Sequence, residues 1–255
     1  MRVLIMSGYG INCEDETLHA FENVGFRGEI VHVNDVIDNP IMFNQYQVIA
    51  FPGGFSYGDD TGSGNAMANK IKNNFSDYLF EFLLKDKLII GICNGCQILV
   101  NLGIVPSSLS TNREVALVEN DSAIYQCRWI NLKVSNNYSP WLKNIKDLYL
   151  PIAHQEGKFI MNNTVQQELL KNKLIACQYV DGRNNLAKQK FPYNPNGSIL
   201  DIAALTNAKG NVLAMMPHPE RAYYFTHQPD WKNKKNKSKY GDGYNIFKNA
   251  SEYFH

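Results

Sequence analysis

The chain has 255 residues, of which 44% are hydrophobic and 19% charged, so it can bury the core of one α/β domain or of two small ones. Its formal net charge of +1 at pH 7 gives no general reason to expect nucleic acid or an anionic membrane as a partner. Five scattered cysteines do not suggest a disulfide framework, and no stretch resembles a signal peptide or approaches the ~20 apolar residues of a membrane span, so we expect a cytoplasmic protein.

Strand-like and helix-like segments alternate over residues 1–92. Buried strands are predicted at residues 2–6, 29–33, 48–51 and 88–92, and helices at 14–24 and 66–84. The predicted buried faces are formed by Leu18, Phe21 and Val24 in the first helix, which Gly25 should end, and by Phe75, Leu79, Phe82 and Leu83 in the second. This alternation predicts an α/β three-layer sandwich, with helices on both faces of a mostly parallel sheet. Such sheets bind ligands beyond the carboxyl ends of their strands.

The pattern changes after Pro106. Residues 114–134 and 147–160 show short alternating segments without helical repeats, which predict an added antiparallel section. The later part of the chain is predicted to form a turn at 194–197 (NPNG), a hairpin of strands 203–205 and 212–216, and a closing helix at 244–254 that packs Ile246, Phe247 and Tyr253 on the domain.

A lysine-rich run, KNKKNKSK, occupies residues 232–239. A charge run of this kind is usually a solvated surface loop, and nucleic-acid binding is the weaker alternative. Because the sequence shows no internal repeat and no linker, residues 1–255 are predicted to form a single domain, which carries this run in a surface insertion at about 228–241.

The most informative segment for chemistry is IIGICNGCQ, at residues 89–97. A β-branched apolar run ends there in Gly-x-Cys-x-Gly, and an apolar helix-like stretch follows, as in a nucleophile elbow. The turn requires minimal side chains two residues before and two after its apex, where this chain has Gly91 and Gly95. Cys93 would then lie over the first N–H groups of a helix, whose positive end stabilises a thiolate. The pattern predicts covalent catalysis by Cys93.

Three other interpretations of this segment stay open. Cysteine is often buried, so Cys93 can be a packing residue at a strand end. Cys93 and Cys96 also have the C-x-x-C spacing of a redox pair, although a thioredoxin-like chain carries that motif after the first strands of a short domain. Zinc binding is less favoured still, because no second pair of Cys or His lies at ligand spacing.

A cysteine nucleophile works with a base, and the base needs an orienting group. MPHPE, at residues 216–220, offers both, because in an extended segment residues i and i+2 point the same way and would place His218 beside Glu220. The two prolines suit a strand exit at the rim of a site. His-x-Glu alone is a weak signal, and among the other histidines His154 also lies in a Gly-bearing turn near an acid, Glu156.

Acyl transfer further needs an oxyanion hole of backbone N–H groups. FPGGFSYG, at residues 51–58, directly follows a predicted strand, and Gly53 and Gly54 can expose N–H groups there, with the N–H of Asn94 as the other donor. A phosphate-binding loop is the competing interpretation, but such a loop ends in Gly-Lys-Ser/Thr, whereas this one runs into two aspartates. An ordinary turn is also possible.

Five motifs occur in a fixed order along the chain: PGGFSYGD, GICNGCQ, PIAHQEG, NPNGS and MMPHPER. Together they resemble the glutamine amidotransferase subunits of phosphoribosylformylglycinamidine synthase, which belongs to purine biosynthesis. The resemblance runs from residue 1 to about residue 222, including GINCEDE and VHVND, and resumes in the closing helix. The elbow and His-Pro-Glu are shared with other triad-type glutamine amidotransferases. The motifs FSYGD, NPNGS and PIAH-x-EG narrow the resemblance to the amidotransferases of purine synthesis.

The resemblance implies the flavodoxin-like fold of class I glutamine amidotransferases and glutaminase activity. Cys93 would attack the side-chain amide of glutamine and form a glutamyl thioester. His218 would protonate the departing ammonia and later activate water, while Glu220 orients His218. Gly54 and Asn94 would supply the oxyanion hole. The residues expected to bind substrate are Gly53, Gln97, His154 and Glu156.

The resemblance also implies partners. Ammonia must reach a synthetase active site before it is protonated and lost to water, so a large ATP-dependent synthetase on a separate polypeptide is expected, with a small third subunit. No cofactor or metal is expected in this chain, and ATP and Mg²⁺ are expected on the synthetase. The lysine-rich run departs from the compact form of the family and leaves the local partner contact open.

Two other functions are kept as alternatives. An amidotransferase of the same architecture could serve another acceptor. A non-catalytic glutamine sensor or protein-binding module could also keep the fold, although a degenerate domain usually loses at least one of Cys93, His218 and Glu220, and all are intact here. A measurement of glutamate release from glutamine would distinguish an enzyme from a protein that only binds glutamine.

Overall fold

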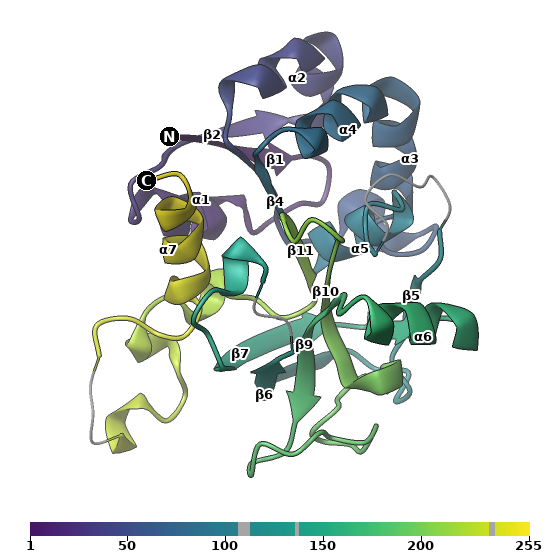
Figure 1. Cartoon of the computed structure of the whole chain (residues 1–255), viewed down its shortest axis with the longest axis vertical. Helices are drawn as coiled ribbons and strands as arrows, with labels where there is room; N and C mark the ends of the chain where they lie inside the picture. The colour runs from purple at the N-terminus through teal and green to yellow at the C-terminus, as the bar shows by residue number, and fades with distance from the viewer. Residues whose placement is uncertain (107–112, 136–137, 235–237) are drawn as a thin grey trace.

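A mixed sheet organises the chain (Figure 1). The computed structural model describes residues 1–106, 113–135, 138–234 and 238–255. Within these residues the main sheet has nine strands, five of which run parallel to one another and continue into an antiparallel half. A second, two-stranded sheet pairs β5 (Ala116–Glu119) with β8 (Glu156–Ile160) in antiparallel register.

The parallel half of the main sheet is built mainly from the N-terminal part of the chain. In sheet order its strands are β2 (Arg27–His32), β1 (Arg2–Ser7), β3 (Val48–Phe51), β4 (Leu88–Ile92) and β11 (Val212–Met215). The three strands β3, β4 and β11 are buried at every position, as expected where helices cover both faces of a sheet. Their carboxyl ends lie at the same edge, where the sequence predicts the site.

The antiparallel half continues the sheet from β11. Its strands are β10 (Ile202–Thr206), β9 (Ile175–Val180), β6 (Gln126–Val134) and β7 (Asp147–His154), in sheet order. Residues 207–211 join β10 to β11 as a hairpin. The predicted hairpin and the predicted antiparallel section are both confirmed.

Helices lie on both faces of the parallel strands (Figure 1). One face carries α1 (Glu14–Glu22) and α7 (Tyr244–Tyr253), which meet through an edge-on contact of Phe21 and Phe247 with ring centroids 5.0 Å apart. The other face carries α3 (Asn65–Asn74), α4 (Ser76–Leu84) and α5 (Asn94–Asn101). The remaining helices are α2 (Val33–Asp38), after β2, and α6 (Asn163–Lys171), before β9. The predicted α/β sandwich is therefore confirmed.

The predicted single helix over residues 66–84 is wrong. The chain forms α3 and α4, which are separated at Phe75, whose backbone (φ −149°, ψ 23°) is not helical. Phe75 is nevertheless 2% exposed, and the other residues predicted to be buried there are buried as well. The break turns the second helix so that its apolar side still meets the core.

Two further packing predictions need correction. In α1 the buried face is formed by Thr17, Ala20 and Phe21. Leu18 is only half-buried, and so is Val24, which lies beyond the end of the helix at Glu22. Leu18 packs over Gly28 in β2, which is an edge strand and offers less cover than the sheet centre. In α7, Ile246 and Phe247 are fully buried as predicted, but Tyr253 is 37% exposed.

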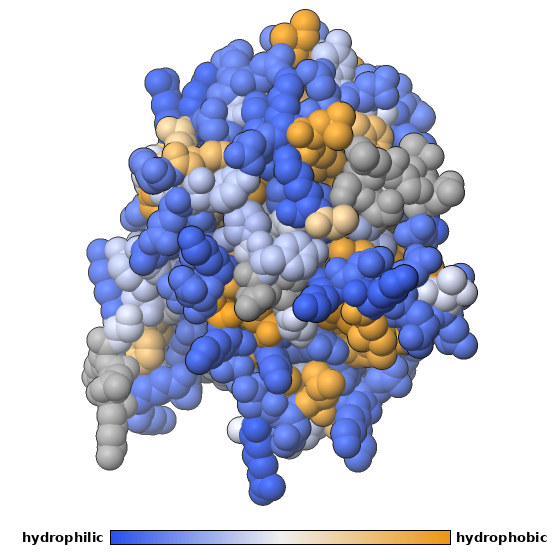
Figure 2. Space-filling view, in the orientation of Figure 1, coloured by the Kyte–Doolittle hydropathy of each residue, from blue (hydrophilic) through white to orange (hydrophobic). Residues whose placement is uncertain are grey.

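The surface in Figure 2 is predominantly hydrophilic, and hydrophobic residues form separate patches on it. The longest α-helices have 10 residues, and none of the helices described is long and apolar enough to cross a membrane. The insertion predicted at 228–241 includes residues 235–237, which lie outside the described residues.

Candidate active site

Cys93 stands at a strained turn between β4 and α5. Its backbone angles (φ 52°, ψ −105°) lie outside the regions that L-residues normally adopt, and its side chain is 5% exposed. A Cβ on Gly95 would lie 1.9 Å from the carbonyl oxygen of Phe51, and a Cβ on Gly91 would lie 2.6 Å from that of Gly95. Only glycine fits such close approaches of backbone to backbone. The strand–turn–helix geometry of the predicted elbow is confirmed.

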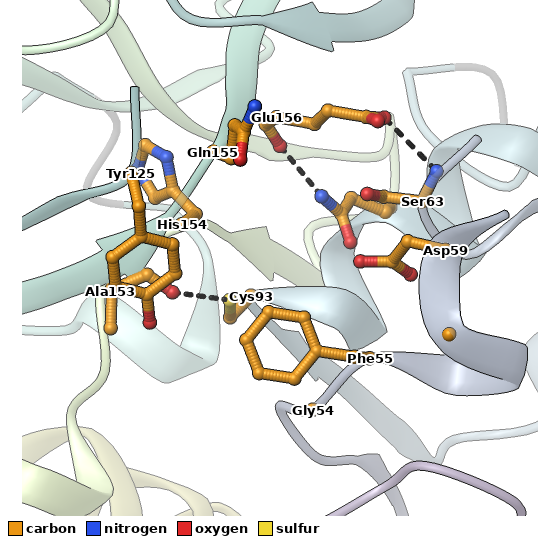
Figure 3. Close-up of a pocket in the computed structure, with 12 residues that line it drawn as sticks. Gly54, Phe55, Asp59, Ser63, Cys93, Tyr125, Ala153, His154, Gln155 and Glu156 are labelled. Carbon is orange, nitrogen blue, oxygen red and sulfur yellow. Dashed lines mark hydrogen bonds between the residues drawn. The ribbon is translucent and has the colours of Figure 1, made fainter. Parts of the chain in front are cut away.

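Cys93 lines a cavity of about 250 Å³ beyond the carboxyl ends of the parallel strands (Figure 3). The cavity walls come from the loop that contains Gly54, Asp59 and Ser63, from the elbow, from Tyr125 and from residues 153–156. This volume is below the range of sites for drug-sized ligands and suits a ligand of the size of one amino acid.

A buried pair formed by His218 and Glu220 lies beside the elbow. The distance between His218 Nδ1 and Glu220 Oε1 is 2.5 Å, so the two side chains are side by side as predicted. The predicted extended backbone is wrong, because Pro219 has helical angles (φ −68°, ψ −31°) and Glu220 begins a short 3-10 helix. This turn brings the carboxylate back to the ring, while the N–H of His218 donates to the carbonyl of Pro151 at 2.8 Å and fixes the segment to β7.

The surroundings of His218 favour its protonated form. Burial opposes the positive charge, but the charges of Glu220 and Cys93 outweigh this effect and raise the pKa of His218 well above its ordinary value. The ring can therefore supply a proton at neutral pH.

The nucleophile and the imidazole flank the same glycine. A Cβ on Gly53 would lie 2.8 Å from Cε1 of His218 and 3.5 Å from Cβ of Cys93. The thiol of Cys93 donates to the carbonyl of Ala153 at 3.6 Å, and His218 Nε2 has no hydrogen-bond partner among the described residues. That nitrogen is available to a nucleophile or a leaving group, and such contacts commonly tighten only when substrate binds.

Two backbone N–H groups are available as oxyanion donors. The N–H groups of Asn12 and Cys13 both donate to the carbonyl of Gly53, at 3.2 Å each. Because the C=O and N–H of a trans peptide point in opposite directions, the N–H of Gly54 is turned away from residues 12–13, on the side of the cavity that Gly54 lines. In the part of the chain that the structure describes, no backbone hydrogen bond uses the N–H of Gly54 or of Asn94. The geometry fits an oxyanion hole.

Gln97 and Glu156, both predicted to bind substrate, connect the elbow to the turn between β7 and β8. Gln97 Nε2 donates to the backbone carbonyl of Glu156 at 2.6 Å, and its Oε1 accepts from Asn94 Nδ2 at 2.9 Å. The Glu156 carboxylate accepts from the N–H of Ser63 at 3.0 Å (Figure 3). These bonds place both side chains at the cavity wall, where their role as substrate contacts stays a prediction.

His154 also lines the cavity, but not as a partner of Glu156. It is 2% exposed, and neither ring nitrogen has a hydrogen-bond partner among the described residues. Burial, together with the positive charge of His218, lowers the pKa of His154 to about 3. His154 is therefore neutral at physiological pH, which leaves His218 as the histidine that can carry a proton at this site.

Comparison with known proteins identifies the family. Residues 1–254 match the CobB/CobQ-like glutamine amidotransferase domain. The chain is 46% identical to phosphoribosylformylglycinamidine synthase subunit PurQ of Methanococcus maripaludis, over 99% of this chain and 98% of that protein. It is 39% identical to subunit PurQ of Dehalococcoides mccartyi, over 98% and 96% of the two chains. The chain belongs to this family of glutamine amidotransferase subunits.

One solved structure agrees with this family membership, and a second, more distant one shares the fold. A chain in the structure of PurLQS from Thermotoga maritima matches with a TM-score of 0.73 and 29% identity, over 100% of this chain and 99% of that one. Another glutamine amidotransferase from Thermotoga maritima matches with a TM-score of 0.51 at 12% identity, over 86% of this chain and 76% of that one, a likeness that shows the fold alone.

Several residues of this amidotransferase site were not singled out from the sequence. Asp59 lies in the same motif as Gly54 and lines the cavity with Glu156; burial, and then the charge of Glu156, raise the pKa of Asp59. Its position in PGGFSYGD is a signal that could have identified it. Tyr125, whose ring centroid is 6.3 Å from that of Phe55, comes from the antiparallel section and has no local signal.

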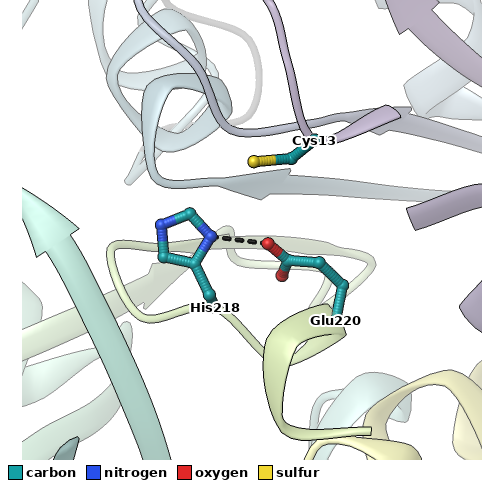
Figure 4. Close-up of side chains that lie close together, drawn as sticks. All are labelled: Cys13, His218 and Glu220. Atoms are coloured by element: carbon teal, nitrogen blue, oxygen red, sulfur yellow. Dashed lines mark hydrogen bonds and ion pairs between the residues drawn. The ribbon is translucent and has the colours of Figure 1, made fainter. Parts of the chain in front are cut away.

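Cys13 belongs to the GINCEDE segment, in which the sequence indicates no role for it, and it lies next to the buried pair (Figure 4). The sulfur of Cys13, a ring nitrogen of His218 and a carboxylate oxygen of Glu220 lie within 4.8 Å of one another. These are ligand types that zinc accepts. However, the guanidinium of Arg221 donates to the Cys13 sulfur at 2.9 Å, and its positive charge opposes a cation there. The expectation that the chain holds no metal stays a prediction.

Proposed function

We propose that this chain is the glutaminase subunit of a phosphoribosylformylglycinamidine synthase. It hydrolyses glutamine to glutamate and ammonia, and delivers the ammonia to a synthetase for the ATP-dependent conversion of formylglycinamide ribonucleotide to formylglycinamidine ribonucleotide. The observation that carries this proposal is the strained Cys93 elbow, with a cavity in front of it and the His218–Glu220 pair beside it. Full-length similarity to the Methanococcus maripaludis subunit supports this acceptor over another one.

In the proposed mechanism, the thiolate of Cys93 attacks the side-chain amide carbon of glutamine, and the electron pair moves to the amide oxygen. The N–H groups of Gly54 and Asn94 stabilise that oxygen. His218 gives its proton to the amide nitrogen, the C–N bond breaks, and ammonia leaves a glutamyl thioester. The neutral ring of His218 then takes a proton from water as the water attacks the thioester, and glutamate leaves with restoration of the thiolate. Glu220 orients the ring and stabilises its positive charge.

The α-ammonium group of glutamine is proposed to bind between the carboxylates of Asp59 and Glu156. The two carboxylates face the same cavity, and the charge of Glu156, after burial, raises the pKa of Asp59, so a cation bound between them would stabilise the charged form of Asp59. Gln97 keeps the Glu156 turn in place through its backbone carbonyl, and the neutral ring of His154 offers hydrogen bonds to the substrate. Gly53 leaves room between nucleophile and base.

The proposed partners are a large ATP-dependent synthetase and a small third subunit, on separate polypeptides. Similarity to a chain in the PurLQS structure supports this arrangement. By contrast, the phosphoribosylformylglycinamidine synthase of Drosophila melanogaster is a much longer protein, in which the region that matches this chain makes up only 17% of the length. We propose that ATP and Mg²⁺ bind the synthetase, that the whole chain acts as one domain, and that it works in the cytosol, where its five free cysteines stay reduced.

The proposed function is tested by mass spectrometry of the intact chain after incubation with 6-diazo-5-oxonorleucine, a glutamine-analogue electrophile. The expected result is a single adduct, which excess glutamine suppresses and which Cys93→Ala abolishes. Cys127→Ala is the matched control, because that cysteine is exposed and away from the cavity.

The same measurement is repeated with the synthetase present. An adduct that forms only then would mean that partner binding completes the site. An adduct that forms on Cys127, or that Cys93→Ala retains, would show that the nucleophile is wrongly assigned. Absence of any adduct, alone and in the complex, would refute the glutaminase and leave the non-catalytic glutamine sensor.

A further inference from the structure

Cys13 is completely buried at the start of α1, and it lies outside the cavity that Cys93 lines. Its sulfur accepts a hydrogen bond from Arg221 Nη2 at 2.9 Å, and its thiol donates to the side-chain oxygen of Asn12 at 3.3 Å. Figure 4 shows the sulfur above the space between the ring of His218 and the carboxylate of Glu220. Cys13 also favours the protonated form of His218 directly, although less than Glu220 and Cys93 do. These contacts give the thiol a role beyond packing in the core.

Arg221 has two acceptors within reach. Its Nε lies 3.8 Å from Glu220 Oε1, which is the oxygen that His218 Nδ1 contacts at 2.5 Å. The second oxygen of Glu220 has no hydrogen-bond partner among the described residues. Carboxylates are the acceptors that a guanidinium binds most strongly, often through two parallel bonds. An Arg221 released from Cys13 would therefore turn to Glu220 and compete with His218 for its charge.

We propose that Cys13 is a positioning residue of the glutaminase, whose sulfur keeps the Arg221 guanidinium beyond hydrogen-bond distance of Glu220, at 3.8 Å, so that this carboxylate serves His218. The inference rests on the proposed function, because it concerns the same catalytic pair. It assigns a purpose to a buried thiol that does not line the cavity in front of Cys93.

The charge on His218 is set by groups from several elements. The titratable and charged groups that face it are Glu220 and Arg221 from its own segment, Cys13 from the start of α1, Cys93 from the elbow, His154 from β7 and Tyr125 from the loop before β6. His154 is neutral at physiological pH. Loss of the Cys13 sulfur would free the guanidinium of Arg221, and its positive charge would move toward Glu220.

The consequence for catalysis has a definite sign. Glu220 is the largest contribution that favours the proton on His218, against burial, which opposes it. When Arg221 binds the Glu220 carboxylate directly, less of the negative charge of Glu220 is left to stabilise the proton on His218. His218 then loses its proton at a lower pH, and the basic limb of the pH–rate profile shifts to lower pH. A shift of about one pH unit is expected, with about a tenfold lower kcat above that limb. The KM for glutamine should stay within about twofold, because Cys13 does not line the cavity.

The experiment measures glutamate release against pH for the full chain in complex with its synthetase. Cys13→Ala should show the shifted basic limb, and Cys13→Ser should restore the wild-type profile, because a hydroxyl also accepts from the guanidinium. In the double variant Cys13→Ala with Arg221→Gln, the competing charge is gone and the limb should move back toward the wild-type pH, short of it only by the direct contribution of Cys13 to the proton on His218. Cys177→Ala, which removes another fully buried thiol, controls for loss of core packing.

Two results would overturn the inference. One is a wild-type pH profile in Cys13→Ala; the other is a loss of activity in Cys13→Ala that neither Cys13→Ser nor the double variant relieves, as expected for a purely structural thiol. Failure of the proposed function is distinguishable, because the wild-type complex itself would then release no glutamate. If Cys13→Ala does not fold, Cys13→Val replaces it, because valine fills the space without offering an acceptor to Arg221. The basic limb should then shift in Cys13→Val and not in Cys13→Ser, and equal profiles in the two variants would overturn the inference.

Discussion

Replacing Gly54 with alanine tests whether the loop after β3 supplies an oxyanion donor. Gly54 has φ +153°, and a Cβ there would lie 2.5 Å from the carbonyl oxygen of Gly10 and 2.7 Å from Cα of Ile11. Both contacts are to backbone atoms of the segment before α1, which cannot rotate aside as a flexible side chain would. The loop itself must therefore shift, and the N–H of Gly54 must move with it.

The magnitude follows from what the N–H is proposed to do. Loss of one oxyanion-hole donor typically lowers kcat by about 10²–10³, or about 2.7–4 kcal/mol of transition-state stabilisation. The KM for glutamine should change little, because the donor acts on charge that develops in the transition state. The left-handed backbone alone adds a penalty of about 1–2 kcal/mol to folding, because alanine carries a Cβ.

The assay compares glutamine-dependent with ammonia-dependent synthesis by the complex. Gly54→Ala should lose the first and keep the second, because added ammonia bypasses the glutaminase. Gly25→Ala is the matched control: Gly25 also has a positive φ, +95°, but a Cβ there would meet nothing within 4 Å. If Gly54→Ala and Gly25→Ala show the same kcat with glutamine, at similar melting temperatures, the oxyanion assignment of this loop is wrong.

Three other predictions concern the rest of the site. Cys96→Ser should keep substantial glutaminase activity, because Cys96 is fully buried and burial raises the pKa of its thiol well above the ordinary value; complete loss would revive the redox interpretation. Asp59→Asn should raise the KM for glutamine about tenfold or more with a smaller change in kcat, and an unchanged KM would remove Asp59 from the ammonium site. The pKa of His154, lowered from 6.5 to about 3, means that the unfolded chain binds a proton more readily, so stability is lost as the pH falls from about 6.5 toward 3. His154→Leu should flatten that part of the pH dependence in urea titrations, and an unchanged slope would contradict a buried neutral ring.

The nucleophile elbow could be predicted because its requirements are local. A strand, two glycines around a cysteine and an apolar helix are neighbours in sequence, and the close approach of Gly95 to Phe51 is the physical reason for the pattern. The helix break at Phe75 could not be predicted in the same way. The apolar spacing continues across it, so only the fit of the buried rings against the core decides where the helix ends and restarts.

The pair formed by Cys13 and Arg221 shows the limit of local patterns most clearly. The two residues are 208 positions apart, and neither belongs to a motif whose spacing implies the other. They meet because α1 packs beside the segment that leaves β11. Patterns of residue type can propose a nucleophile or a base, but they contain little information on the second layer of contacts that sets the charge on the base.

The order of strands in the sheet joins the local motifs into one site. β11 pairs with β4 in parallel, with Met215 opposite Ile92, although the two strands lie in different parts of the sequence. The N–H of Cys93 donates to the carbonyl of Met215 at 2.8 Å, so the chain that leaves β11 emerges directly beside the elbow. His218 follows three positions later, and the turn at Pro219 returns Glu220 to its ring. Parallel pairing of these two strands is therefore the feature of the fold on which the proposed chemistry depends.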